Sequence, residues 1–292
     1  MPNSNAPNTA RNIRPIRELS GEVARKIAAG EVIDRPAAVI RELIDNAIDG
    51  GATQIDVEII SGGIESIRVR DDGCGMTKED LSLCTRTHTT SKIITENDLL
   101  SLSTLGFRGE ALSSIHAVSR LEIISARDGT AWKLTSSGLE PDRLPVGTVI
   151  QINGLFDNFP ARRLFLKRPA SEAALCRQVV QEKALAWPGI SFRYSSQGTN
   201  PLVLPAVQSL RERVLAALAP QEPESFFHVI ENSGEGFSFS VIAGTPETAR
   251  ANRRSLMVYV NGRRIQEYGL IQALEYGAEG YFPNGTHPFA VL

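Results

Sequence analysis

The chain has 292 residues, of which 42% are hydrophobic and 22% are charged, and its net charge is −2 at pH 7. These values are typical of a globular protein and exclude a strong overall positive field, so contact with DNA would require a local basic cluster. Three scattered cysteines without a C-x-x-C pair argue against a disulfide framework or a zinc site, and they favour a reducing cytosol.

The sequence contains no secretory signal and no apolar run long enough to span a bilayer, so we expect no membrane partner and a cytoplasmic location, or a nuclear one in a eukaryote. Residues 1–12 are polar and predict a disordered tail. The length favours two domains, which we place at 13–205 and 206–292. The chain stops in an apolar run typical of a strand, so we expect it to be an N-terminal portion of a longer protein, with its second domain truncated.

The predicted elements of the first domain begin with a helical pattern over 17–51, broken near Gly30 and Pro36. Alternating runs at 54–60 and 66–70 predict a strand pair. Later patterns predict helices over 78–84, 110–116 and 171–186, strands over 120–125, 132–135 and 147–156, and a hairpin over 191–204. In the second domain they predict a helix over 210–218, a hairpin turn at 233–236, a strand over 256–260 and a helix over 268–277. This order indicates an α+β fold or a mixed α/β sandwich, followed by a smaller βαβ-like unit.

The helix expected before residue 50 has a polar face. Glu42 and Asn46 are four residues apart, and Asp49 continues the same face. Glu42 could orient and deprotonate a water molecule, and the amide oxygen of Asn46 could hold Mg²⁺, which favours oxygen ligands and few protein contacts. A polar face exposed to solvent is the alternative, and for this helix taken alone it is the commoner explanation.

A D-x-G-x-G pattern follows the second predicted strand at Asp71, Gly73 and Gly75. The carboxylate could accept a hydrogen bond from an exocyclic amine such as that of adenine, and the glycines could let a flat base approach the backbone. Thr148, at the start of a later strand, could support the carboxylate through a water molecule. Ordinary turn chemistry is the alternative, since this pattern alone is weak evidence.

A glycine-rich run, GFRGEAL at 106–112, precedes a predicted helix, and HTTSK at 88–92 lies ahead of it. The glycines allow successive backbone N–H groups to point at an anion, and the helix adds its positive N-terminal end. Lys92 and Arg108 could offset phosphate charge. The alternative is a flexible surface loop, and the absence of a G-x-x-x-x-G-K-[S/T] motif excludes a Walker-type site.

In this order, the motifs resemble the MutL family of DNA mismatch repair ATPases, within the GHKL superfamily that includes DNA gyrase, a heat-shock chaperone and histidine kinases. The matching text is KIAAGEVI at 26–33, RPA at 35–37, RELIDN at 41–46, DDGCG at 71–75, TSK at 90–92, GFRGEAL at 106–112 and PARR at 160–163. The GFRGEAL run is absent from the gyrase, chaperone and kinase branches. The resemblance is dense over 13–166 and weaker, but still ordered, to the end of the chain.

The resemblance implies a fold and a set of roles. The fold would be a mixed β-sheet covered by helices on one face, the Bergerat-type ATPase fold, followed by a smaller βαβ-type domain. ATP and Mg²⁺ would be the cofactors, with Glu42 as the general base, Asn46 as the Mg²⁺ ligand and Asp71 as the acceptor for the adenine amine. The remaining nucleotide contacts would come from Gly75, Thr90, Lys92, Gly106, Phe107, Arg108, Gly109 and Thr148.

The resemblance also implies a cycle for a DNA clamp. ATP would order an arm at about 13–24 and bring two copies together as a homodimer, and hydrolysis to ADP would release them. Mismatch-recognition and downstream repair proteins would be partners. The alternative function is a nucleotide-gated scaffold or binding module without significant turnover. The family's phosphate-contacting lysine lies beyond the end of this chain, so turnover by these 292 residues would be slow.

Two departures from the family pattern have physical consequences. Asp72 stands where Asn is commoner, and its charge beside Asp71 could weaken ATP affinity or demand a cation. Gly50 replaces an alanine and is expected to loosen the helix end. The segment at 157–160 also differs from the family text, and we have no physical account of that change.

Two basic clusters are candidates for sequence-independent contact with double- or single-stranded DNA. The first contains Arg162 and Arg163, and the second contains Arg253, Arg254 and Arg263. A solvated surface explains the first cluster equally well. Phosphate contact by the second cluster, across a clamp, would depend strongly on salt.

Overall fold

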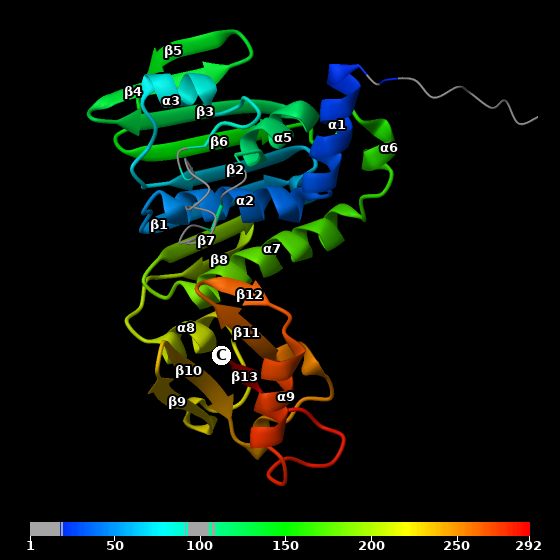
Figure 1. Cartoon of the computed structure of the whole chain (residues 1–292), viewed down its shortest axis with the longest axis vertical. Coiled ribbons are helices and arrows are strands. Elements are labelled where there is room, and N and C mark those ends of the chain that lie inside the picture. The colour runs from blue at the N-terminus through cyan, green and yellow to red at the C-terminus, as the bar shows by residue number, and fades with distance from the viewer. Residues whose placement is uncertain (1–17, 19, 91, 93–104, 107–108) are drawn as a thin grey trace, which may run out of the picture.

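The computed structural model describes residues 18, 20–90, 92, 105–106 and 109–292. The tail expected over 1–12, half of the arm expected over 13–24, and both Phe107 and Arg108 lie outside the described residues. Within the described part, a larger sheet with its helices is followed along the molecule by a smaller sheet (Figure 1). The predicted fold class, an α+β protein with a second and smaller domain, is therefore confirmed.

The larger sheet contains, in the described part of the chain, eight strands in the order β5-β4-β3-β6-β2-β1-β7-β8. Neighbouring strands are antiparallel except β1 and β7, which are parallel, so the sheet is mixed. The strands are β1 Gln54–Ile60, β2 Ser66–Asp71, β3 Arg120–Arg127, β4 Thr130–Thr135, β5 Gly138–Asp142, β6 Gly147–Asn153, β7 Ser191–Ser196 and β8 Thr199–Leu204.

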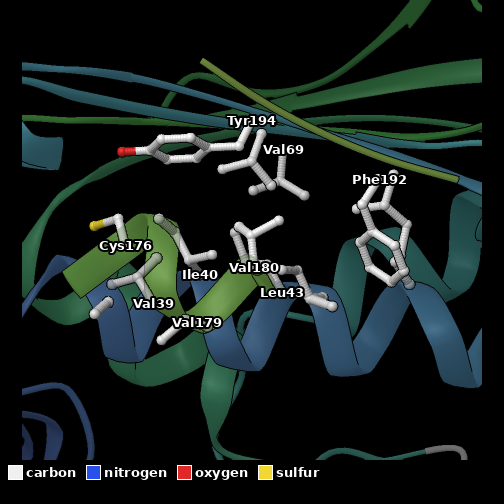
Figure 2. Packing of buried hydrophobic residues seen from close by; sticks show 14 of the residues in the cluster. Val39, Ile40, Leu43, Val69, Cys176, Val179, Val180, Phe192 and Tyr194 are labelled. Carbon is white, nitrogen blue, oxygen red and sulfur yellow. The ribbon is translucent and has the colours of Figure 1, made fainter. Parts of the chain in front are cut away.

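Helices pack against this sheet and against one another. They are α1 Gly21–Val32, α2 Pro36–Asp49, α3 Lys78–Leu83, α5 Ala111–Val118, the short α6 Pro160–Arg163 and α7 Pro169–Ala186. Figure 2 shows α2 and α7 on the same side of the sheet, with buried side chains filling the space between. In the described residues, no helix is both long enough and apolar enough to cross a bilayer.

The core fixes the orientation of α2. Ile40 and Leu43 point from this helix toward Val69 of β2 and Phe192 of β7 (Figure 2), and all four side chains are buried. Each such side chain contributes roughly 1.5–3 kcal/mol of transfer free energy. Because the apolar face of α2 packs against the sheet, its polar face points away from the core and can line a site.

The second domain contains α8 Leu210–Leu218 and a sheet that, in the described residues, has the strand order β12-β11-β13-β10-β9. Its other elements are β9 Phe227–Gly234, β10 Phe237–Gly244, β11 Leu256–Val260, β12 Arg263–Ile265, α9 Tyr268–Gly277 and β13 Ala290–Val291. Strands β11 and β13 are parallel and are joined through α9, which makes the predicted βαβ unit. Strand β13 lies between β10 and β11, and Ala290 pairs with both Ala243 and Leu256.

Several boundaries differ from the sequence patterns. Gly30 lies inside α1, and the break between the first two helices falls at 33–35, directly before Pro36 as expected. Strand β6 ends at Asn153 because Gly154 adopts a φ of +63°, a turn conformation that glycine takes without strain. Strands β5 and β12 were not predicted, since both are short and lack a clear alternation.

Candidate functional site

Asp71 lies at the end of β2, where its register partner on β6 is Thr148. Its Oδ1 accepts a hydrogen bond of 2.9 Å from the N–H of Gly73, and the backbone N–H of Thr148 also bonds to the carboxyl. Burial raises the pKa of Asp71 to about 6, because it outweighs these hydrogen bonds, which lower the pKa. At neutral pH the group is a partly buried carboxylate at the end of a strand.

The glycines beside Asp71 are required by the backbone around them. Gly75 has a φ of +65°, and a Cβ there would lie 1.9 Å from the carbonyl oxygen of Ala126. A Cβ on Gly73 would lie 2.8 Å from the carbonyl oxygen of Gly50. The sequence suggested that these glycines admit a flat base. The structure gives a further reason for them, namely the close approach of neighbouring strands and of the end of α2.

A buried hydroxyl pair supports the turn after Asp71. Ser125 on β3 is fully buried, and its Oγ accepts a 2.8 Å hydrogen bond from the N–H of Met76. The same Oγ lies 2.9 Å from the Oγ1 of Thr148. Sequence reasoning identified Thr148 but missed Ser125. The signal was a serine within an otherwise apolar run, which becomes informative only when β3 and β6 are known to be neighbours.

Asp72 does not point a free charge at this site. Its Oδ1 accepts hydrogen bonds from the backbone N–H groups of Thr53, at 2.7 Å, and Gln54, at 2.8 Å, and its Oδ2 accepts one from the Thr53 hydroxyl at 2.5 Å. Burial acts to raise the pKa of Asp72, but these bonds outweigh it, so the pKa lies below its usual value. The carboxylate anchors the start of β1, which is a structural reason for this departure from the family pattern.

The polar face of α2 meets the residues around the glycine-rich run. The Nζ of Lys92 donates to the Oδ1 of Asn46 at 2.9 Å and to the Oδ2 of Asp49 at 2.6 Å. The backbone N–H groups of Leu105 and Gly106 donate to the two oxygens of Asp49 at 2.8 and 2.9 Å. The predicted residues Asn46, Lys92 and Gly106 therefore lie together, although they are far apart in the chain.

The other predicted residues of this region lie nearby in the fold. The N–H of Lys92 donates to the Oγ1 of Thr90 at 3.1 Å. Gly109 has a φ of +62°, and a Cβ there would lie 2.7 Å from the carbonyl oxygen of Thr89. Glu42 is half-buried on α2, one turn before Asn46.

The two halves of the site meet at the C-terminal end of α2. Asp49, the last residue of this helix, holds Lys92 and Gly106, and the next carbonyl, that of Gly50, accepts a 2.9 Å hydrogen bond from the N–H of Cys74. The N–H of Gly50 bonds back to the carbonyl of Asn46 and so closes the helix. Hydrogen bonds on both sides of Gly50 therefore offset the loosening that glycine is expected to cause at this helix end.

The donor set is compatible with Mg²⁺ bound mainly by a nucleotide. In the described residues, no group of three or more His, Cys, Asp or Glu side chains is arranged to hold a metal. The amide oxygen of Asn46 already accepts from a cationic group, the ammonium of Lys92, so it is oriented toward positive charge. Mg²⁺ commonly takes one or two protein oxygens together with phosphates and water, and this site fits that pattern.

The candidate DNA-binding arginines mostly have protein partners. Arg162 donates to the carbonyl of Gly30, and Arg163 pairs with Asp157. Arg253 forms two hydrogen bonds with Glu275, at 2.8 and 2.9 Å. Arg254 is exposed. Arg263 donates at 3.0 Å to the carbonyl of Leu105 in the first domain. The second predicted cluster is thus divided between α9 and the contact between the domains.

Two known protein families match different parts of the chain. The family described as "Histidine kinase-, DNA gyrase B-, and HSP90-like ATPase" matches residues 34–139, which contain α2, Asp71 and the glycine-rich run. The family described as "DNA mismatch repair protein, C-terminal domain" matches residues 217–292. The fold and the first match define the class of protein: a GHKL-type ATPase domain followed by a second domain.

Relatives with both parts are DNA mismatch repair proteins called MutL. The chain is 47% identical over 298 residues to the protein of Treponema pallidum, with 96% of this chain and 48% of the relative covered. It is 38% identical over 284 residues to that of Syntrophotalea carbinolica, with 95% and 45% covered. The chain belongs to the MutL family, and it spans about half the length of these relatives.

Solved structures agree with this assignment. The ATPase domain of Aquifex aeolicus MutL complexed with ADP superposes with a TM-score of 0.62 at 26% identity, and the match covers 89% of this chain and 93% of that one. The N-terminal domain of a DNA repair protein gives a TM-score of 0.74 at 22% identity, covering 94% and 88%, and shows the shared fold.

Proposed function

We propose that this chain binds ATP with Mg²⁺ and hydrolyses it slowly to ADP and phosphate. The observation that carries the proposal is the meeting of two subsites at the end of α2: the Asp71 carboxyl on one side, and Asn46, Lys92 and Gly106 on the other. A carboxylate suits a base amine, and an ammonium with backbone N–H groups suits phosphates. The ADP complex of the Aquifex aeolicus domain supports the same ligand class.

Each predicted residue has a place in this proposal. Asp71 accepts from the adenine amine, with Gly75 and Thr148 beside the base. Asn46 supplies its amide oxygen to Mg²⁺, which, when bound, offsets phosphate charge and polarises the bond that breaks. The phosphate contacts come from Thr90, Lys92, Gly106, Phe107, Arg108 and Gly109.

Glu42 is the proposed general base, because its carboxylate precedes Asn46 by one turn on the same face of α2. Its role is to orient the attacking water and to take its proton. Glu42→Ala should reduce turnover by at least about a hundredfold while ATP binding is retained. Glu58→Ala, which changes an exposed carboxylate on β1, is the matched control. Loss of ATP binding together with turnover would show that Glu42 is structural.

The cellular role follows from the family. We infer that ATP binding promotes homodimerisation of a DNA clamp in mismatch repair, in the cytoplasm or in a nucleus, with mismatch-recognition and downstream repair proteins as partners. Sedimentation of the chain with a non-hydrolysable ATP analogue tests the dimer. The alternative is a nucleotide-gated scaffold, which would show the same dimer with ATP but no measurable phosphate release.

The first test of nucleotide binding compares the native chain with Asp71→Asn in equilibrium titrations with ADP and Mg²⁺. We expect the substitution to weaken binding at least about tenfold, since a buried hydrogen bond to a charged group is lost. Asp128→Asn, at an exposed turn, is the matched control and should bind ADP as the native chain does. Absence of ADP binding by the native chain would overturn the proposed function.

A further inference from the structure

The carboxylate of Asp49 collects three donors from the glycine-rich region. Its Oδ2 accepts from the Lys92 ammonium at 2.6 Å and from the Gly106 N–H at 2.9 Å, and its Oδ1 accepts from the Leu105 N–H at 2.8 Å. The Asp49 side chain is only 6% exposed and that of Lys92 20%, so these bonds lie largely out of water. A paired charge in such a place is held more strongly than at the surface.

This donor set has the chemistry of a phosphate site. One ammonium and two successive backbone N–H groups are typical ligands for a phosphate oxyanion. They are filled here by a carboxylate of the protein itself. The Lys92 ammonium also bonds to the Oδ1 of Asn46 at 2.9 Å, so the same ion pair places a positive charge on the oxygen that we assign to Mg²⁺.

We propose that Asp49 is an internal competitor of the nucleotide: its carboxylate takes the place of a phosphate on Lys92, Leu105 and Gly106 until ADP or ATP displaces it. This inference rests on the proposed nucleotide binding. Asp49 acts through Lys92 and is therefore a positioning residue. It keeps the donors assembled and their charge balanced without ligand, and it lowers affinity because each binding event must break this ion pair.

Two simpler roles give different results. If Asp49 only positions the donors, its neutralisation should weaken nucleotide binding. If Asp49 only repels phosphate at a distance, its neutralisation should strengthen binding whether or not Lys92 is present. Competition for Lys92 predicts stronger binding that depends on Lys92.

The test is a double-variant cycle with ADP and with adenosine, which lacks phosphates. Asp49→Asn should bind ADP about tenfold more tightly than the native chain, while adenosine affinity should change by less than about twofold. In the Lys92→Met background, the gain for ADP from Asp49→Asn should fall to about threefold or less, since only the two backbone N–H groups are still contested. Equal or weaker binding of ADP by Asp49→Asn, or a gain that is undiminished without Lys92, would overturn the proposal.

A measurement on the native chain keeps the proposal testable if Asp49→Asn does not fold. In ¹H–¹⁵N spectra, the amide signals of both Leu105 and Gly106 should move when ADP is added and stay in place with adenosine. If ADP binds and these signals do not move, Asp49 is not displaced and the proposal is wrong. If the native chain binds neither ADP nor adenosine, it is the proposed function that fails.

Discussion

The guanidinium of Arg263 donates a 3.0 Å hydrogen bond to the carbonyl oxygen of Leu105, while the N–H of Leu105 donates to Asp49 at 2.8 Å. One peptide segment is thus bonded on one side to β12 of the second domain and on the other to the end of α2. Leu105 therefore carries both one of the phosphate-type donors, its N–H, and the carbonyl that makes the contact between the domains.

Replacing Arg263 by Met should weaken this contact. A hydrogen bond from a charged donor contributes about 1.5–3 kcal/mol, so Arg263→Met should lower the free energy of unfolding by about 1–2 kcal/mol and reduce ADP affinity several-fold, as measured by urea unfolding and by titration. Arg193→Met, which changes an exposed arginine on β7, is the control and should stay within about 0.5 kcal/mol of the native chain. Equal losses in the two variants would contradict the role of the bond to Leu105.

Nucleotide affinity should depend on pH through Asp71. Burial raises the pKa of this carboxyl to about 6, and only the ionised form accepts hydrogen bonds with both oxygens. Affinity for ADP should therefore fall as the pH drops from 7.5 to 5.5, and titrations across this range measure it. A profile that stays flat over these values would show that Asp71 does not contact the base.

The same raised pKa has a consequence for stability. The folded state holds this proton more tightly than the unfolded state, so the stabilisation is fully present below about pH 4 and is lost as the pH rises through 6. Asp71→Asn, which removes the charge, should be more stable than the native chain by about 1–3 kcal/mol at pH 8, with a much smaller difference at pH 4. Urea unfolding at the two pH values checks this.

Ser125→Ala should disturb the turn after Asp71 from a distance. It removes the acceptor for the N–H of the half-buried Met76 and the partner of the buried Thr148 hydroxyl. We expect a loss of about 1–3 kcal/mol in the free energy of unfolding and weaker ADP binding. Ser137→Ala, in an exposed turn, is the matched control. Native ADP affinity in Ser125→Ala would mean that the hydroxyl pair does not shape the site.

The ion pair between Asp45 and Lys183 joins α2 to α7 across 2.5 Å, with side chains 12% and 13% exposed. Burial is the largest cause of the raised pKa of Asp45, and Lys183 acts to lower that pKa, so the carboxylate depends on its partner. Lys183→Met alone should cost about 3 kcal/mol, whereas Asp45→Leu with Lys183→Met should cost much less, because no unpaired charge remains. Thermal unfolding of the single and double variants measures the difference, and additive losses would contradict it.

DNA binding is predicted to involve Arg253 and Arg254, and the charge reversals Arg253→Glu and Arg254→Glu should lower DNA affinity without changing ADP affinity. Each should also reduce the salt slope of DNA binding by about one unit, as expected for a lost phosphate contact. The effect of Arg254→Glu should be the cleaner of the two, because Arg253 also bonds to Glu275. Unchanged DNA binding at low salt would exclude this surface.

The sequence by itself determined most of the elements and the character of the site. The boundaries of β1, α8, β11 and α9 match the predicted ones. Strand β1 alternates, and β11 is a short apolar run, so both are visible in the local sequence. The resemblance of the ordered motifs to the MutL family also predicted that Asn46, Lys92 and Gly106 belong to one site. These features depend on local pattern, which a single sequence records directly.

Only the tertiary structure decided which groups are partners. Asp49 and Lys92 are separated by 43 residues, Ser125 and Thr148 by 23, and Arg263 and Leu105 by 158. Strand order and helix packing set these pairings, and neither is encoded in the period of one segment. For the same reason the sequence suggested that the charge of Asp72 could weaken ATP affinity or demand a cation, whereas the fold supplies this carboxylate with three donors at the start of β1.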